Sequence, residues 1–174
     1  MRLRCYLGHG ASGTAASMAP FVAGLRARGI TATAIDLPRR KAEDALPAFH
    51  QVVPSAAEVA IGGHSYGGRV ASLAAAEPDA PYAALVLFSY PLHPPGAPER
   101  TAARISHWPS IRCPVLLLSG ESDPFAQVDL LRASVAQLMR AELVTYPRLG
   151  HTLKPVLEDA LDRAATFLLA ISGS

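Results

Sequence analysis

The chain has 174 residues, of which 50% are hydrophobic and 17% are charged, and its formal net charge is +2. This composition predicts one globular domain over residues 1–174 and excludes a disordered chain. Basic residues are scattered, and the densest run, Arg39 to Lys41, is typical of a solvated loop or helix start, so no nucleic-acid partner is expected.

Short apolar runs alternate with longer amphipathic ones along the chain. Continuous apolar strands that alternate with helices are typical of a mainly parallel sheet covered on both faces. The sequence therefore predicts an α/β fold with a six-stranded sheet, and Pro47 is expected to kink or delay the second helix. In chain order, the predicted elements are a strand at 3–8, a helix at 17–29, a strand at 30–36, a helix at 41–53, a strand at 58–63, a helix at 66–77, strands at 83–90 and 113–120, a helix at 125–140, a strand at 141–147 and a helix at 155–170.

Residues 91–110 form the one long stretch without clear periodicity, and its prolines prevent a regular strand or a long early helix. The stretch leaves the carboxyl end of a central strand, and ligands of open α/β sheets bind at that edge. It is interpreted either as the rim of a site or as a plain connection. His93 and Trp108 from this stretch, together with Phe125, are expected to shape a substrate pocket.

Four glycines surround Ser65 in the sequence "IGGHSYGGRV", residues 61–70. Residues 63–67 fit G-x-S-x-G, in which a serine sits at the tip of a tight turn between a strand and a helix. A side chain at Gly63 or Gly67 would collide with the neighbouring strand or helix. Ser65 is therefore the candidate nucleophile, and the N–H of Tyr66 is a candidate oxyanion donor. The alternative is a glycine-rich turn that binds phosphate or only reverses the chain, although the lysine of a P-loop is missing.

A serine hydroxyl needs a base, and the base needs a carboxylate that orients it. His151 follows the last predicted strand and lies at the same sheet edge as Ser65, so it is the candidate base. The alternative is a helix-capping or surface histidine. His64 is adjacent to Ser65 in the sequence, but side chains next to the tip of the turn are expected to point away from the serine. Asp123 follows the strand at 113–120 and is the candidate acid, with Glu121 as its rival. Asp123 could also cap a helix that Pro124 begins.

The loop "LGHGASG", residues 7–13, follows the first strand directly. Small residues allow backbone N–H groups to approach a substrate carbonyl, and we assign the N–H of Ala11 as the second oxyanion donor. Gly10 makes the loop tight, and Gly10 and Ser12 are expected to contact substrate. His9 is expected to anchor the loop by hydrogen bonding. The alternative is an ordinary glycine-rich turn.

No apolar run reaches the roughly 18 residues of a membrane span, and no secretory signal is recognisable. Cys5 and Cys113 lie in or beside strand-like runs. We expect buried thiols in a reducing compartment, the cytoplasm, and neither a disulfide nor a metal site.

The motifs "GHGASG", "GGHSYGG", "SGESDPF" and "LGHTLKP" together resemble the α/β-hydrolase superfamily, whose chain order of serine, acid and histidine is also that of Ser65, Asp123 and His151. The size resembles a compact, cap-less, dienelactone-hydrolase-like branch. The resemblance implies a minimal α/β-hydrolase fold that lacks the first two strands and a cap domain, with residues 91–110 as the only lid candidate.

The resemblance also implies a serine hydrolase that cleaves a small ester or thioester through an acyl-enzyme intermediate. It implies a small-molecule acyl substrate and no metal or organic cofactor, and it leaves the oligomeric state open. Two alternatives remain: a catalytically silent scaffold protein of the same fold, and an acyltransferase that uses the same triad.

Overall fold

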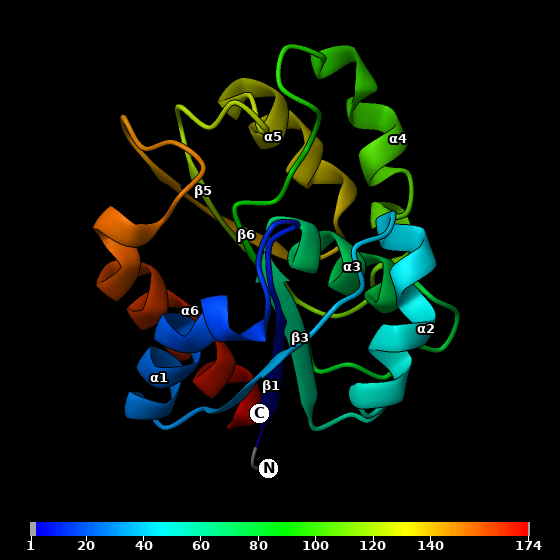
Figure 1. The fold of residues 1–174 in the computed structure, drawn as a ribbon, viewed down its shortest axis with the longest axis vertical. Coiled ribbons are helices and arrows are strands. Elements are labelled where there is room, and N and C mark those ends of the chain that lie inside the picture. Colours follow the sequence, from blue (N-terminus) through cyan, green and yellow to red (C-terminus); the bar gives the residue numbers. More distant parts are fainter. Residues whose placement is uncertain (1–2, 174) are drawn as a thin grey trace.

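The computed structural model describes residues 3–173, and within them six parallel strands form one sheet in the order β2-β1-β3-β4-β5-β6 (Figure 1). The predicted six-stranded parallel sheet is confirmed. The strands are β1 (Arg4–Gly8), β2 (Thr31–Ile35), β3 (Val59–His64), β4 (Ala84–Phe88), β5 (Val115–Gly120) and β6 (Ala141–Tyr146).

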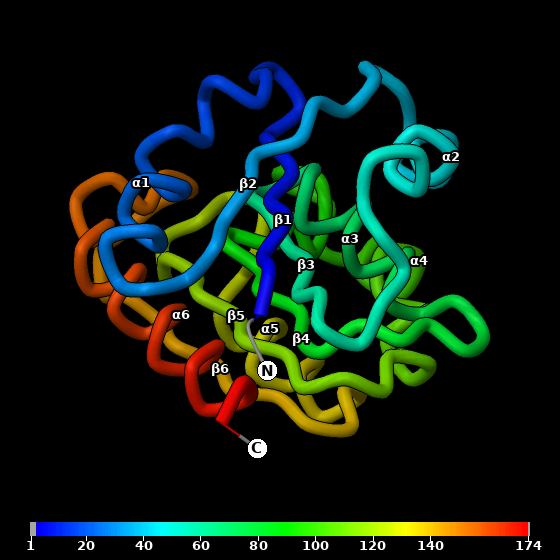
Figure 2. Tube along the Cα trace, turned by 90° about the horizontal axis from the view of Figure 1, so that it is seen from below, coloured from blue at the N-terminus to red at the C-terminus, as the bar shows by residue number. Residues whose placement is uncertain are grey.

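Helices cover both faces of the sheet. The pair α1 and α6 packs on one face, and α2 and α3 pack on the other, as the ribbon and the view from below both show (Figures 1 and 2). The helices are α1 (Ala19–Ala27), α2 (Ala42–Val52), α3 (Tyr66–Ala75), α4 (Thr101–Ile105), α5 (Val128–Ser134) and α6 (Leu157–Ser172). Within the described part of the chain, no helix has both the length and the apolar character that a bilayer crossing requires.

The central strand β4 shows why its sequence is continuously apolar. Leu85 and Leu87 belong to the core between the sheet and α2 and α3, whereas Val86 and Phe88 belong to the core between the sheet and α1 and α6. Alternate residues of a strand face opposite sides, so a strand covered on both faces must bury every side chain. Each fully buried side chain of this size contributes about 1.5–3 kcal/mol.

Two predicted helices differ from the structure. Pro47 lies inside α2, which begins at Ala42 and continues to Val52, so the expected delay does not occur. The helix predicted at 125–140 is limited to α5 and a short 3-10 turn that follows it. It begins late because the N–H groups of Phe125 and Gln127 donate to the side chains of Asp123 and His93 instead of entering a helix.

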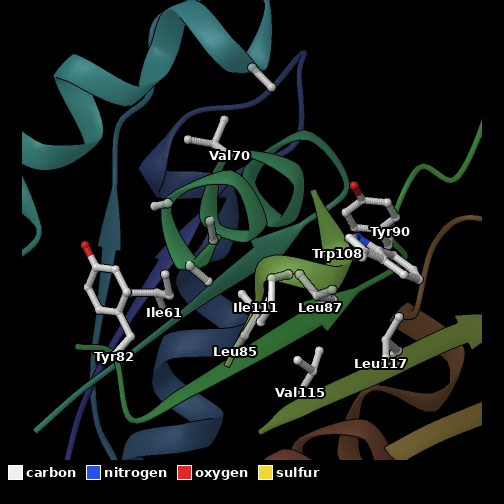
Figure 3. Close-up of a cluster of buried hydrophobic side chains, with 14 of the residues drawn as sticks. Ile61, Val70, Tyr82, Leu85, Leu87, Tyr90, Trp108, Ile111, Val115 and Leu117 are labelled. Atoms are coloured by element: carbon white, nitrogen blue, oxygen red, sulfur yellow. The ribbon is translucent and has the colours of Figure 1, made fainter. Parts of the chain in front are cut away.

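The segment 91–110 contains α4 and is packed against the core. Trp108 is fully buried, and its ring meets Tyr90 edge to face with centroids 5.2 Å apart (Figure 3). The neighbouring side chains of Leu92 and Ile105 are buried in the same cluster. The expectation that Trp108 shapes a substrate pocket is therefore wrong, because a Pro-rich stretch without periodicity gave no sign of which side chains face the core.

The two cysteines are free thiols. Cys5 is buried in β1, and this burial raises the pKa of its thiol to about 12. Cys113 is half-buried, and burial raises the pKa of its thiol to about 11. Both thiols are therefore protonated near neutral pH and are weak nucleophiles.

A buried polar network joins α3 to the segment after α4. Ser72 donates its hydroxyl to the Arg69 carbonyl (2.7 Å), and its Oγ lies 2.8 Å from Nε2 of His107. Burial, followed by the charge of Arg69, lowers the pKa of His107 from 6.5 to about 4. The folded protein therefore holds this imidazole neutral under conditions in which the unfolded chain protonates it.

This network predicts that the free energy of unfolding falls at acid pH. The contribution of His107 to stability is complete above pH 6.5 and is lost as the pH falls toward 4, because the unfolded state binds the proton first. The expected loss is about 2 kcal/mol, after allowing for solvent screening of the half-buried ring. Urea unfolding at pH 7 and pH 4.5 measures it. His107→Gln should flatten this part of the profile, whereas the surface variant His50→Gln should not. An equal fall in the free energy of unfolding in wild type and His107→Gln would show that His107 does not cause the acid sensitivity.

Candidate active site

Ser65 lies at the junction of β3 and α3 in a left-handed backbone conformation, with φ 50° and ψ −114°. Such a conformation costs a non-glycine residue about 1–3 kcal/mol and persists only when its surroundings fix it. Here its N–H donates to the Phe88 carbonyl (2.9 Å), and its carbonyl accepts from the Arg69 N–H (3.0 Å). The turn is therefore held by β4 on one side and by the first turn of α3 on the other.

The glycines around Ser65 make room for close backbone contacts. A Cβ at Gly63 would lie 2.4 Å from the carbonyl oxygen of Gly8, and one at Gly67 would lie 2.2 Å from the Gly8 carbonyl carbon. Real Cβ atoms essentially never approach backbone this closely. The predicted collision of side chains at both positions is confirmed, and the neighbour is β1.

The structure brings Ser65, Asp123 and His151 together. The Ser65 hydroxyl lies 2.9 Å from His151 Nε2, and His151 Nδ1 lies 2.8 Å from Asp123 Oδ2. The Asp123 side chain is fully buried, and the His151 side chain is 24% exposed. Because a carboxylate only accepts, Nδ1 carries the proton and donates it, which leaves the Nε2 lone pair directed at the serine hydroxyl.

Hydrogen bonds also distinguish the two candidate acids, Asp123 and Glu121. The Glu121 carboxylate accepts from Arg132 (3.0 Å) and Thr145 (2.7 Å) and does not reach His151. Asp123 does not cap α5, which begins only at Val128. Its second oxygen instead accepts the Phe125 N–H (2.8 Å) in a local turn, which fixes the orientation of the carboxylate.

The loop after β1 faces the serine. Ala11 lies at the tip of a turn closed by the bond from the Gly13 N–H to the Gly10 carbonyl (3.0 Å). The N–H of Tyr66, the first residue of α3, has no acceptor within its helix. The Tyr66 hydroxyl donates to the Pro38 carbonyl (2.8 Å), so its side chain lies outside the cavity.

His9 holds this loop from beneath. It is 2% exposed, its Nδ1 lies 2.7 Å from the Gly10 carbonyl oxygen, and its Nε2 accepts from the Leu37 N–H (2.9 Å). Nδ1 must therefore donate, and the imidazole is neutral with both nitrogens occupied. The prediction that His9 anchors the loop by hydrogen bonding is confirmed.

A cavity of about 440 Å³ lies over Ser65 and His151, next to the loops that follow β1 and β3. The chain leaves these neighbouring strands toward opposite edges of the sheet, which is where open α/β sheets bind ligands. Of the residues predicted to contact substrate, Gly10, Ser12 and Phe125 line the cavity, as does Ala11. The lining that the sequence did not predict comprises Gly13, Ser17, Met18, Phe21, His64, Thr152, Leu153 and Lys154.

A family model described as an alpha/beta hydrolase domain matches residues 6–170. The chain belongs to the alpha/beta hydrolase family. No curated protein matches this α/β hydrolase at a significant level. Among the described residues, no group of three or more His, Cys, Asp or Glu side chains is arranged to hold a metal ion.

Solved structures share the fold of this α/β hydrolase at low sequence identity. A monoacylglycerol lipase from Paleococcus ferrophilus is 16% identical, with a TM-score of 0.79 over 97% of this chain and 94% of that chain. Est1E from Butyrivibrio proteoclasticus, solved with ferulic acid, is 18% identical, with a TM-score of 0.79 over 99% and 90% of the two chains. A thioesterase domain from the curacin biosynthetic pathway is 16% identical, with a TM-score of 0.74 over 97% and 91%.

Aromatic rings enclose the candidate base of the α/β hydrolase. The Phe125 ring lies 4.5 Å from the His151 ring, and the His64 ring lies 5.2 Å from it on another side. His64 Nε2 is 3.3 Å from the His151 carbonyl oxygen. The sequence argument that side chains next to the turn point away from the serine is therefore wrong for His64, which lines the same cavity. Burial lowers the pKa of His64, so this ring is neutral near pH 7.

His93 has a positioning role and does not line the cavity. It is 3% exposed, its Nε2 accepts from the Gln127 N–H (3.0 Å), and its Nδ1 lies 2.8 Å from the Pro94 carbonyl oxygen. The backbone N–H of His93 donates to the Phe125 carbonyl (3.0 Å). These bonds join His93 to the segment that carries Asp123 and Phe125, and its expected contact with substrate stays a prediction. The rim interpretation of residues 91–110 is wrong for this cavity, which none of them lines.

Gly120, at the end of β5, sets the position of His151. A Cβ there would lie 2.2 Å from the Leu149 carbonyl oxygen and 2.3 Å from that of Gly150. The Ser122 N–H donates to the same Leu149 carbonyl (2.8 Å). The loop before His151 therefore rests directly on the backbone that leads to Asp123, and no sequence motif marks this glycine.

We predict that Gly120→Ala separates the histidine loop from Asp123. The backbone must move to admit the methyl group, which should cost about 3 kcal/mol of stability and reduce kcat/KM at least about a hundredfold. The matched control is Gly150→Ala, because a Cβ at Gly150 meets nothing within 4 Å. Thermal unfolding and ester hydrolysis measure both effects. Equal activity of the two variants would contradict this role of Gly120.

Proposed function

We propose that this protein is a serine hydrolase that cleaves a small ester or thioester through Ser65, Asp123 and His151. The observation that carries the proposal is the continuous contact from carboxylate to imidazole to hydroxyl, 2.8 and 2.9 Å long, at the floor of an open cavity. A buried carboxylate, an oriented imidazole and a strained serine between strand and helix are the parts that acyl transfer requires.

In the first half-reaction, Ser65 Oγ attacks the substrate carbonyl carbon while His151 Nε2 takes the hydroxyl proton. The carbonyl oxygen becomes an oxyanion that the N–H groups of Ala11 and Tyr66 face, and each such donor is worth about 3 kcal/mol in the transition state. His151 then gives its proton to the leaving oxygen or sulfur as the bond to carbon breaks. Asp123 stabilises the imidazolium and keeps its proton on Nδ1.

In the second half-reaction, water attacks the acyl carbon and His151 Nε2 takes its proton. The tetrahedral intermediate collapses, the bond from the acyl carbon to Ser65 Oγ breaks, and Oγ regains the proton from His151. The partial exposure of His151 gives water access to this position.

The volume and lining of the cavity are suited to a small, mainly apolar acyl group. Its volume of about 440 Å³ lies in the lower part of the range for small-molecule sites. Met18, Phe21 and Leu153 supply apolar surface, and Lys154 is the one formally charged side chain besides the candidate base. The family membership and the esterase, lipase and thioesterase chemistry of the structural neighbours support ester or thioester cleavage in general.

Removal of the nucleophile tests the proposal. Ser65→Ala should lower kcat/KM for p-nitrophenyl acetate by at least about a thousandfold, because it removes the hydroxyl that contacts His151 Nε2. The control variant Ser110→Ala removes an exposed hydroxyl outside the cavity and should retain wild-type turnover. Activity that survives in Ser65→Ala would show that another group carries the reaction.

A covalent probe separates a hydrolase from a silent scaffold of the same fold. A fluorophosphonate should add once to wild type at Ser65, as intact-mass and peptide mass spectrometry would detect, and should not add to Ser65→Ala. Folded wild-type protein that takes up no probe and turns over no ester or thioester would favour the scaffold.

A further inference from the structure

A second cleft is lined by residues at the start of α2, in and before α4 and at the start of α3. In Figure 1 these helices lie on the other side of the molecule from α1. The volume of the cleft is about 400 Å³, and it shares no lining residue with the cavity over Ser65. Its lining contains five cationic side chains and one carboxylate, a formal excess of four positive charges in a chain whose total is +2. The cations are Arg40, Lys41, Arg69, Arg100 and Arg104, and the carboxylate is that of Glu43.

Most of these cations have no carboxylate partner among the described residues, although the Arg104 guanidinium donates to the Pro91 carbonyl (3.2 Å). Within residues 3–173, Arg69 is the one cation of the five that forms a salt bridge, and its partner is Glu43. Burial lowers the pKa of Arg104, and the nearby charges of Arg69 and Arg100 lower it further. The repulsion between these like charges therefore costs electrostatic free energy, and an anion in the cleft would reduce this repulsion.

The start of α2 adds a backbone group suited to an anion, although Glu43 and Asp44 in its first turn already complement part of the helix dipole. Lys41 occupies the N-cap of this 11-residue helix and makes no side-chain capping bond. Ser, Thr, Asp and Asn are favoured there, and a cation opposes the positive end of the helix dipole. Ala42, the first residue of the helix, lines the cleft, and its N–H has no acceptor within the helix. The N–H of Ala42 is therefore suited to a negative ligand in the cleft.

The floor of the cleft is preorganised. Arg69 is 8% exposed, and its guanidinium donates to the Arg104 carbonyl (2.8 Å) and to the Glu43 carboxylate. These hydrogen bonds join α3 to α2 and α4 through the Arg69 side chain. The segments that hold the rim cations are therefore fixed relative to one another. Arg40 and Lys41 precede α2, and Arg100 precedes α4.

We propose that this cleft binds a small, multiply charged anion of the phosphate class, such as a diphosphate or a phosphate ester. Two or more negative charges match the unpaired cations, and guanidinium groups bind phosphate oxygens in paired hydrogen bonds. The volume of about 400 Å³ and the rim supplied by the starts of α2 and α4 suit a small molecule. The site is distinct from the proposed hydrolase centre and does not depend on that activity.

The test is isothermal titration calorimetry with inorganic pyrophosphate, in metal-free buffer at 20 and at about 150 mM salt. Wild type should bind one pyrophosphate per chain, and Lys41→Gln and Arg100→Gln should each weaken binding about tenfold through loss of a charge-assisted contact. Arg39→Gln is the matched control, because Arg39 is an exposed neighbour that does not line the cleft. Lys154→Gln controls for binding in the cavity over Ser65. Thermal unfolding checks that every variant is folded.

Several results would overturn the proposal. One is the absence of pyrophosphate binding to folded wild type at 20 mM salt. A second is equal weakening by Arg39→Gln, which would indicate diffuse surface attraction. A third is loss of binding in Lys154→Gln alone, which would place the anion in the cavity over Ser65. Finally, a single-stranded oligonucleotide that binds more tightly than pyrophosphate through Lys41 and Arg100 would assign the cleft to nucleic acid.

Discussion

The contact of three backbones at Gly8, Gly63 and Gly67 is the constraint on which the rest of the site depends. Because no side chain separates them, β1, β3 and the first turn of α3 pack closer than any other residue would allow. This packing drives the connecting residue, Ser65, into its left-handed conformation and raises its hydroxyl above the sheet. It also brings the loop after β1 next to the start of α3, so the same contact that positions the candidate nucleophile positions both candidate oxyanion donors.

Two buried histidines hold the loops on either side of this contact in the same way. In His9 and in His93, Nδ1 lies within hydrogen-bond distance of the next residue's carbonyl, and Nε2 accepts a backbone N–H from a distant loop. A neutral imidazole is suited to this task because it offers one donor and one acceptor in fixed directions. His9 thus ties the β1 loop to Leu37, and His93 ties the segment after β4 to the segment after β5 that carries Asp123.

The sequence could predict the elements and the three converging residues because both depend on local signals. Continuous apolar strands between amphipathic helices specify a parallel sheet, and in such a sheet Ser65, Asp123 and His151 all follow strands at one edge. The errors concern side chains whose surroundings come from distant segments. Trp108 faces the core because α3 and β4 lie under it, and His64 faces the cavity because the loop around Gly10 and His151 enclose it. Neither direction is encoded by periodicity.

The first turn of α3 lies between the cavity over Ser65 and the basic cleft. Its N-terminus points at Ser65, while Tyr66 and Arg69 line the cleft on the other side. Arg69 follows Ser65 by four residues, so the two backbones are separated by only about 6 Å along the helix, which is less than a Debye length at physiological salt. Because Arg69 is paired with Glu43, any further positive potential at the oxyanion position comes from the unpaired cations on the rim of the cleft. An anion bound in the cleft would cancel part of that positive potential. Binding in the cleft would therefore reduce the electrostatic stabilisation of an oxyanion at Ser65.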